Sequence, residues 1–340
     1  MQKIKLYFFS FLCLTLFVLS QSKPFMEWWS DYRIKQLHAP YTRARYGDLY
    51  SGCFLPHYID TSRGKLKEYK SVHSNNTDLY IIHDSYLAGQ IKKENFVGID
   101  SLILADLRGE GTQIHLNKKK RNILILECSE RNADWRLTDT LISFSKFITN
   151  KKKEIALSEQ PVSFISYFFN PFINQNIEFN LFDYEIFKPC KEIKAQANFF
   201  LFNKLPKDVV ISTDKNYLFL VETIDENYPE SSFRWISEDH IAKMVGYANL
   251  TFRHFKKMGF DEFYFSIIPN PVSILDPGRS HYNYKIDRIE RSGWFEAEYI
   301  DVFENFRNSK KRVFRKDDSH WNSNGLQIWV DKVNAQILSR

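Results

Sequence analysis

The sequence predicts an α/β fold in which helices flank a parallel β-sheet, and three observations favour this class. The 340 residues are 44% apolar, which is enough to bury a large core. Residues 122–127 and 263–268 are continuous apolar runs of strand length, as is typical of strands buried on both faces. Between and after these runs, apolar residues recur at helical spacing, and this alternation of strand and helix indicates parallel pairing.

The N-terminal segment has the pattern of an export signal. Lys3 and Lys5 precede an apolar run over 6–19, and residues 18–21 make a poor cleavage site. This pattern predicts a signal peptide or signal anchor over residues 1–22, and the uncleaved anchor is favoured. We therefore expect an exported protein of the periplasm or cell envelope, anchored to the inner membrane by this segment.

The rest of the chain divides by composition. Residues 23–75 are rich in aromatic and basic side chains and contain several glycine and proline breakers, which predicts a loop-rich lead-in. Residues 76–340 are predicted to form one main domain. Within it, residues 150–205 carry a lysine cluster and then many Phe and Asn residues with three prolines, which indicates an insertion.

The first strands and turns of the main domain follow from apolar runs and their boundaries. A strand is expected at 79–82, and a helix is expected to begin at or just after Ser85. The next strand is 122–127. Farther along, 208–212 and 217–221 flank a turn rich in Asp and Asn, which predicts a β-hairpin.

The C-terminal part continues the alternation. Ser237 predicts the N-cap of a long helix and Gly259 its end, because hydroxyl side chains and glycine are favoured at these positions. A strand at 263–268 follows, and then a short strand near 299–302. A last helix has apolar residues at helical spacing at Leu326, Trp329, Val330, Val333 and Ile337.

Two short segments supply the residue types of an activated serine. Ser85 follows the first strand, and His320 lies in the run Asp-Asp-Ser-His-Trp-Asn over 317–322. A serine hydroxyl needs a base within hydrogen-bond reach, and the imidazole needs an acid that fixes its tautomer. Asp317 and Asp318 can each supply that acid, and their spacing from the histidine does not decide between them.

The position of Ser85 after a strand adds to the hypothesis. Open α/β folds place their sites at the carboxyl edge of the sheet, and N–H groups of a following helix would stabilise an oxyanion there. Each segment alone has a plainer interpretation: an Asp-Ser pair before a helix is commonly an N-cap, and an Asp-x-His loop is commonly a surface turn. The hypothesis depends on both segments occurring in one exported α/β chain.

These residues resemble a known superfamily. The early Asp-Ser, with the late Asp-x-x-His-x-x-x-x-Gly formed by Asp317, His320 and Gly325, is similar to the SGNH/GDSL hydrolases. The Asp-x-His-Trp form at 318–321 looks more like the alginate O-acetyltransferase (DHHW) branch, although the segment order is permuted because the serine segment comes first. Pro271 stands where that branch has a lysine. Weaker likenesses to the branch lie at 127–132, 214–220 and 259–271.

The resemblance implies an SGNH-like fold and O-acetyl transfer to an envelope or extracellular polysaccharide through an acetyl-serine at Ser85. It implies His320 as base and then acid, Asp318 as the residue that orients it, and Asp317 as the alternate. It also implies a membrane-bound acyltransferase partner. Two alternatives stay open: a carbohydrate O-acetyl esterase with the same triad, and a non-catalytic polysaccharide-binding or assembly protein.

Five other residues are candidates for substrate or oxyanion contacts. Arg131 is expected to bind an anionic sugar or the acyl carbonyl, or else to pair with an acid. Asn270 is expected to donate to the oxyanion, or else to serve as a turn residue. His83 replaces a glycine of the serine segment, and a structural role is favoured for it. Tyr86 and Trp321 are the aromatic candidates beside the serine and the histidine.

Charge and cysteine content exclude other classes. The net charge of +6 is mild for this length, and no basic run is interleaved with aromatic residues, so nucleic-acid binding is not predicted. The four cysteines include no C-x-x-C pair, so no metal site is predicted. The predicted acyl chemistry needs no cofactor.

Overall fold

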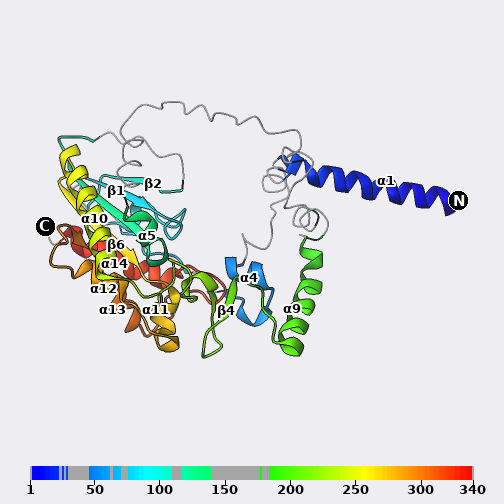
Figure 1. The fold of residues 1–340 in the computed structure, drawn as a ribbon. Helices are drawn as coiled ribbons and strands as arrows, with labels where there is room; N and C mark the ends of the chain where they lie inside the picture. The colour runs from blue at the N-terminus through cyan, green and yellow to red at the C-terminus, as the bar shows by residue number, and fades with distance from the viewer. Residues whose placement is uncertain are drawn as a thin grey trace. The chain divides into compact units, whose positions relative to one another are not determined.

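Figure 1 shows the fold as a computed structural model. The structure describes residues 2–22, 25–26, 28–29, 46–61, 64–69, 76–108, 116–138, 177, 182 and 184–338. The chain forms two compact units, Met1–Ile59 with Glu154–Leu205, and Asp60–Lys153 with Pro206–Arg340. Most of the predicted insertion at 150–205 and part of the predicted lead-in at 23–75 lie outside the described residues.

The second unit is built on a five-stranded parallel sheet with the strand order β2-β1-β3-β6-β7. The predicted α/β class with a parallel sheet is therefore confirmed. The prediction lacks β2, which lies at the edge of the sheet with most of its side chains only half-buried. The strands are β1 (Thr77–His83), β2 (Ser101–Asp106), β3 (Arg121–Ser129), β6 (Glu262–Ile268) and β7 (Glu298–Tyr299).

Helices cover both faces of this sheet (Figure 1). Successive residues of a strand point to opposite faces, so Leu126 packs with α10 and α12, whereas its neighbour Ile125 packs with α13 and α14. Burial on both faces explains the continuous apolar runs of β3 and β6. The helices are α5 (Ala133–Arg136), α10 (Glu238–Met258), α11 (Pro271–Leu275), α12 (Lys285–Glu290), α13 (Phe303–Arg307) and α14 (Ser323–Leu338).

Helix α10 and the β-hairpin form where the sequence predicts them. The Ser237 hydroxyl accepts the backbone N–H of His240 at 3.2 Å, and Gly259 ends the helix with a φ of 107°. The hairpin pairs β4 (Val209–Ile211) with β5 (Leu218–Leu220) in antiparallel register. Single 3-10 turns of this unit are η2 (Lys93–Asn95), η3 (Glu130–Asn132), η5 (Val221–Thr223) and η6 (Pro277–Arg279).

The predicted helix at Ser85 is wrong, because residues 85–90 form turns. The side chain of Asp84 accepts the backbone N–H of Tyr86 at 3.0 Å, which stabilises a turn in competition with a helix. Gly89 follows with a φ of 67°, a left-handed conformation at which a helix would end. Hence no helix N-terminus follows directly after Ser85 to serve an oxyanion.

The first unit holds the N-terminal helix. Among the described residues, α1 (Gln2–Gln21) is the one helix long and apolar enough to cross a membrane, a property that secretory signal sequences share. At 20 residues it is about 30 Å long. The described part of the lead-in is not all loop, since it contains α4. The other elements of this unit are α4 (Asp48–Cys53), η1 (Pro56–Tyr58), η4 (Glu185–Phe187) and α9 (Lys188–Phe202).

Candidate active site

The structure brings the two predicted segments together at the carboxyl edge of the sheet. Ser85 lies two residues after β1, and its Oγ is 2.9 Å from Nε2 of His320, although the two residues are 235 positions apart in the chain. Both side chains remain partly open to solvent, with 20% of the His320 side chain exposed. This is the distance at which an imidazole can take the proton of a hydroxyl.

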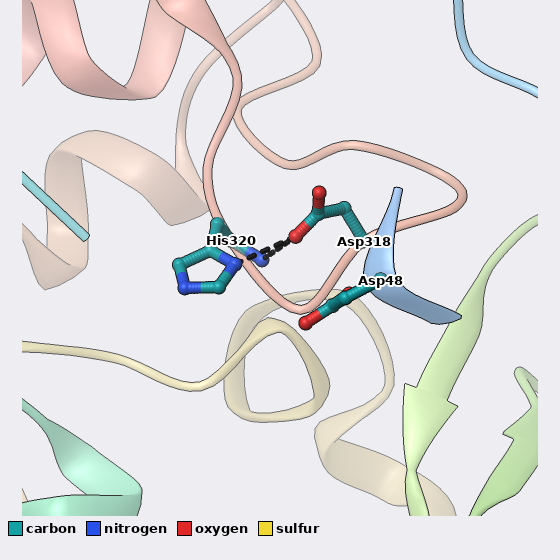
Figure 2. Close-up of side chains that lie close together, drawn as sticks. All are labelled: Asp48, Asp318 and His320. Atoms are coloured by element: carbon teal, nitrogen blue, oxygen red, sulfur yellow. Dashed lines mark hydrogen bonds and ion pairs between the residues drawn. The ribbon is translucent and has the colours of Figure 1, made fainter. Parts of the chain in front are cut away.

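Asp318 orients the imidazole. Its Oδ1 lies 2.6 Å from Nδ1 of His320, as the dashed line in Figure 2 shows. A carboxylate can only accept, so Nδ1 of the ring carries the proton, and Nε2 of the neutral ring is left to accept from the Ser85 hydroxyl. Asp48, also drawn in Figure 2, belongs to the other compact unit.

Asp317 is fully buried and binds elsewhere. Its Oδ1 accepts from Nε of Arg315 at 3.1 Å, and its Oδ2 accepts the backbone N–H of Asp60 at 3.1 Å. The same Arg315 places a second guanidinium nitrogen 3.2 Å from the carboxylate of Asp318. Of the two acids that the sequence left open, Asp318 is thus the one on the imidazole, and Asp317 anchors the loop.

The loop that carries His320 is held at both ends. Phe314 and Trp321 form an antiparallel bridge, and the Arg315 N–H donates to the carbonyl of His320 at 3.3 Å. Asn322 then caps α14, because its side-chain oxygen accepts two N–H groups of the first turn. These bonds fix the direction of the imidazole relative to the sheet.

Asp84 fixes the serine turn to the end of β3. Its carboxylate accepts four hydrogen bonds: from the Tyr86 N–H at 3.0 Å, from the N–H and the hydroxyl of Ser129 at 2.9 Å each, and from the Asn132 amide at 3.0 Å. Burial acts to raise the pKa of Asp84, but these hydrogen bonds outweigh it and hold that pKa below its ordinary value. The residue before the serine is therefore a charged anchor of the turn.

A second buried acid lies beneath Asp84. Oε2 of Glu127 accepts the backbone N–H of Asp84 at 3.1 Å, while its Oε1 has no hydrogen-bond partner within the described part of the chain. Burial, and then the charge of Asp84, raise the pKa of Glu127 well above its ordinary value. The raised pKa favours the neutral form of Glu127, which lessens the repulsion between the two neighbouring carboxyl groups.

Tyr86 and Trp321 are buried beside the site, so a substrate cannot contact their side chains. The hydroxyl of Tyr86 donates to the carbonyl of Ser319 at 2.7 Å, and the indole N–H of Trp321 donates to the carbonyl of Tyr86 at 3.0 Å. Both side chains are buried, and the ring of Tyr86 packs 4.8 Å from that of His320. The expected substrate contacts are therefore corrected to packing, because these two residues join the segments that carry Ser85 and His320.

Of the other three candidate residues, Arg131 lies near the site, whereas His83 and Asn270 have structural roles. The Arg131 guanidinium lies over the ring of Tyr86, 5.9 Å from its centre. His83 is buried, with its Nδ1 2.7 Å from the carbonyl of Asp84, in agreement with the structural role favoured for it. Asn270 is fully buried and donates to the Ser232 hydroxyl at 2.9 Å, which corrects its expected oxyanion contact.

Asp84, Ser129, Asn132 and Arg315 have positions that the sequence did not reveal. A usable signal existed for the first three, because an Asp at the end of one strand faces Ser and Asn at the end of the next strand of a parallel sheet. No such signal marks Arg315, since loop geometry decides which acid a nearby arginine meets.

Comparisons of the chain with protein-family models, with curated proteins and with solved structures find no match. The inference of function therefore depends on the geometry of the site.

Proposed function

We propose that this protein is an exported serine acyl-transfer enzyme of SGNH-like fold that transfers O-acetyl groups to an envelope or extracellular polysaccharide. The observation that carries the proposal is the hydrogen-bonded series from Ser85 Oγ through the His320 ring to Asp318. Ser85 follows a strand of a parallel sheet at its carboxyl edge, and the N-terminal apolar helix α1 fits an export signal or anchor.

In the first half-reaction, Ser85 Oγ attacks the carbonyl carbon of an acetyl donor while Nε2 of His320 takes the hydroxyl proton. The imidazolium that forms is stabilised by the carboxylate of Asp318. Collapse of the tetrahedral intermediate breaks the bond to the donor's leaving group, which receives the proton from His320. The product is an acetyl ester on Ser85.

The oxyanion of that intermediate needs donors other than a helix N-terminus. We assign this role to the backbone N–H of Ser85 and to the side-chain amide of Asn132, whose Nδ2 donates one of its two hydrogens to Asp84. Losing one such donor costs about 3 kcal/mol of barrier in enzymes of this chemistry.

In the second half-reaction, a sugar hydroxyl gives its proton to Nε2 of His320 and attacks the carbonyl carbon of the acetyl-serine. The bond between that carbon and Ser85 Oγ then breaks, His320 returns the proton to Oγ, and the acetyl group remains on the sugar. Attack by water instead would make the protein an esterase. A membrane-bound acyltransferase would supply acetyl groups to the outer side of the membrane, as the family resemblance implies.

The test is mass spectrometry of the intact protein after incubation with an activated acetyl ester. We expect the mass gain of one acetyl group, located on Ser85 and absent from Ser85→Ala. If Ser85→Ala releases acetate as fast as the unaltered chain and no acetylated serine forms, the proposal is wrong. The ratio of sugar acetylation to acetate release then separates the transferase from the esterase.

A further inference from the structure

A cavity lies in the unit that contains the sheet, and it is built by segments that follow β6 and β7. The cavity has a volume of about 310 Å³, within the range of small-molecule sites, and its wall includes Ser273 on α11 and Phe303 and Arg307 on α13. The rest of the wall comes from the chain between Ser273 and α12, including His281, Tyr282 and Tyr284.

Aromatic rings form much of this wall. Tyr282 stacks on Phe303 with ring centres 6.0 Å apart and an angle of 19° between the ring planes. Tyr284 lies against Tyr282 with ring centres 4.8 Å apart. The C–H groups of a sugar ring pack well on such rings, because the face of an aromatic ring carries partial negative charge.

Tyr284 directly precedes α12, and its ring is largely exposed. Its φ is 54°, in the left-handed region that tyrosine rarely adopts, and 57% of the residue is exposed. Strained backbone conformations cluster at functional sites, and this one carries an aromatic side chain of the cavity wall. The nearby Arg307 and His281 supply polar groups suited to sugar hydroxyls or a sugar carboxylate.

The cavity lies along the same sheet edge as the serine. Ser85 follows β1, whereas α11 and α13 follow β6 and β7, which are two and three strands farther along the parallel sheet. With neighbouring strands about 4.8 Å apart, the cavity is roughly 10–15 Å from the serine turn along this edge. Buried bonds connect the two regions, because Ser273 donates to Glu130, which directly follows Ser129.

We propose that this cavity is a sugar-binding subsite that holds one residue of the polysaccharide while a different residue of the same polymer meets Ser85. The identity of the ligand as a polymer rests on the proposed function, whereas the sugar site itself rests on the cavity and its rings. A polymer lying along the sheet edge would contact both places at once.

The test measures binding of glucose, N-acetylglucosamine and hexuronic acid oligosaccharides to the full chain in detergent, beside its turnover of an activated acetyl ester. Tyr284→Asn removes the ring and keeps a residue that tolerates left-handed backbone. We expect about fivefold to tenfold weaker binding of at least one oligosaccharide with ester turnover unchanged. Tyr284→Phe should retain binding, as should Trp235→Ala, which removes a ring that is 79% exposed and outside the cavity.

Three results of these measurements would test the proposed sugar subsite. Failure of all three oligosaccharides to bind, or equal binding by the unaltered chain and Tyr284→Asn, would overturn the subsite. Sugar binding that depends on Tyr284 in a chain that forms no acetyl-serine would support this site while removing the proposed enzymatic activity.

Discussion

Asp318 contacts His320 twice through one oxygen, since its Oδ1 lies 3.0 Å from the backbone N–H and 2.6 Å from Nδ1 of the ring. The first contact fixes the loop and the second fixes the tautomer. A carboxylate two residues before the histidine can therefore do both tasks, whereas Asp317 faces Arg315 and Asp60.

Substitutions at the two neighbouring acids should separate these tasks. We expect Asp318→Asn to lower kcat for an activated acetyl ester by about 10²–10⁴-fold with little change in stability, because the amide favours the wrong tautomer. Asp317→Asn should instead lower the free energy of unfolding by about 1–3 kcal/mol, because a buried partner of Arg315 is lost. Thermal unfolding and ester turnover measured on both variants check this, and the reverse pattern would assign the orienting acid to Asp317.

Glu127 should tolerate a neutral isostere but not truncation. Because burial and the neighbouring charge of Asp84 favour the neutral form of Glu127, Glu127→Gln should keep ester turnover within a few-fold. Glu127→Ala leaves the Asp84 N–H unpaired and opens a cavity, and we expect it to cost about 2–4 kcal/mol of stability and to lower turnover as the serine turn loosens. Equal loss of turnover in both variants would show that the carboxyl group takes part as a charged species.

Gly325 should not accept a side chain. A Cβ at this position would overlap the carbonyl of Val313 and come within 2.9 Å of the Trp321 Cβ. Gly325→Ala should therefore lower the free energy of unfolding by about 1–3 kcal/mol through overpacking beside the site. Gly246 lies on an exposed turn of α10, where an added Cβ would meet no atom of the neighbouring described residues within 4 Å, so Gly246→Ala should raise the free energy of unfolding by about 0.5–1 kcal/mol in denaturant titrations.

Glu290 should make stability fall with pH. Burial, and then the charges of Asp301 and Asp287, raise the pKa of Glu290 from 4.5 to about 9. Between these values the folded chain holds a proton that the unfolded chain has released, so the free energy of unfolding decreases as pH rises, by up to about 1.4 kcal/mol per pH unit from this group. The contribution is complete below pH 4.5 and is lost as pH rises through 9.

Denaturant titrations at several pH values test that assignment. Glu290→Gln should flatten the dependence between pH 5 and 9, while Glu94→Gln, at an exposed carboxylate, should leave it as it is. An unchanged slope in Glu290→Gln would mean that the carboxyl is charged in the folded protein.

The sequence was sufficient where local chemistry decides structure. Strands β1, β3 and β6 follow from their apolar runs, and the helix after Ser237 follows from its cap. The pairing of Ser85 with His320 was predicted from residue types together with the family resemblance. The sequence was insufficient where a contact distant in sequence decides, as at Ser85, where the side chain of Asp84 and the end of β3 hold a turn in place of a helix. The choice between Asp317 and Asp318 likewise depends on the position of Arg315.

The large separation between Ser85 and His320 has a consequence for biogenesis. A polypeptide that crosses a membrane from its N-terminus delivers the hydroxyl early, but the imidazole arrives only with the last helix. Until then Ser85 has no histidine to take its proton, and the carbonyl of Tyr86 lacks the indole N–H of Trp321. For the enzyme that we propose, a chain cut short before the final loop should therefore be inert toward acyl donors.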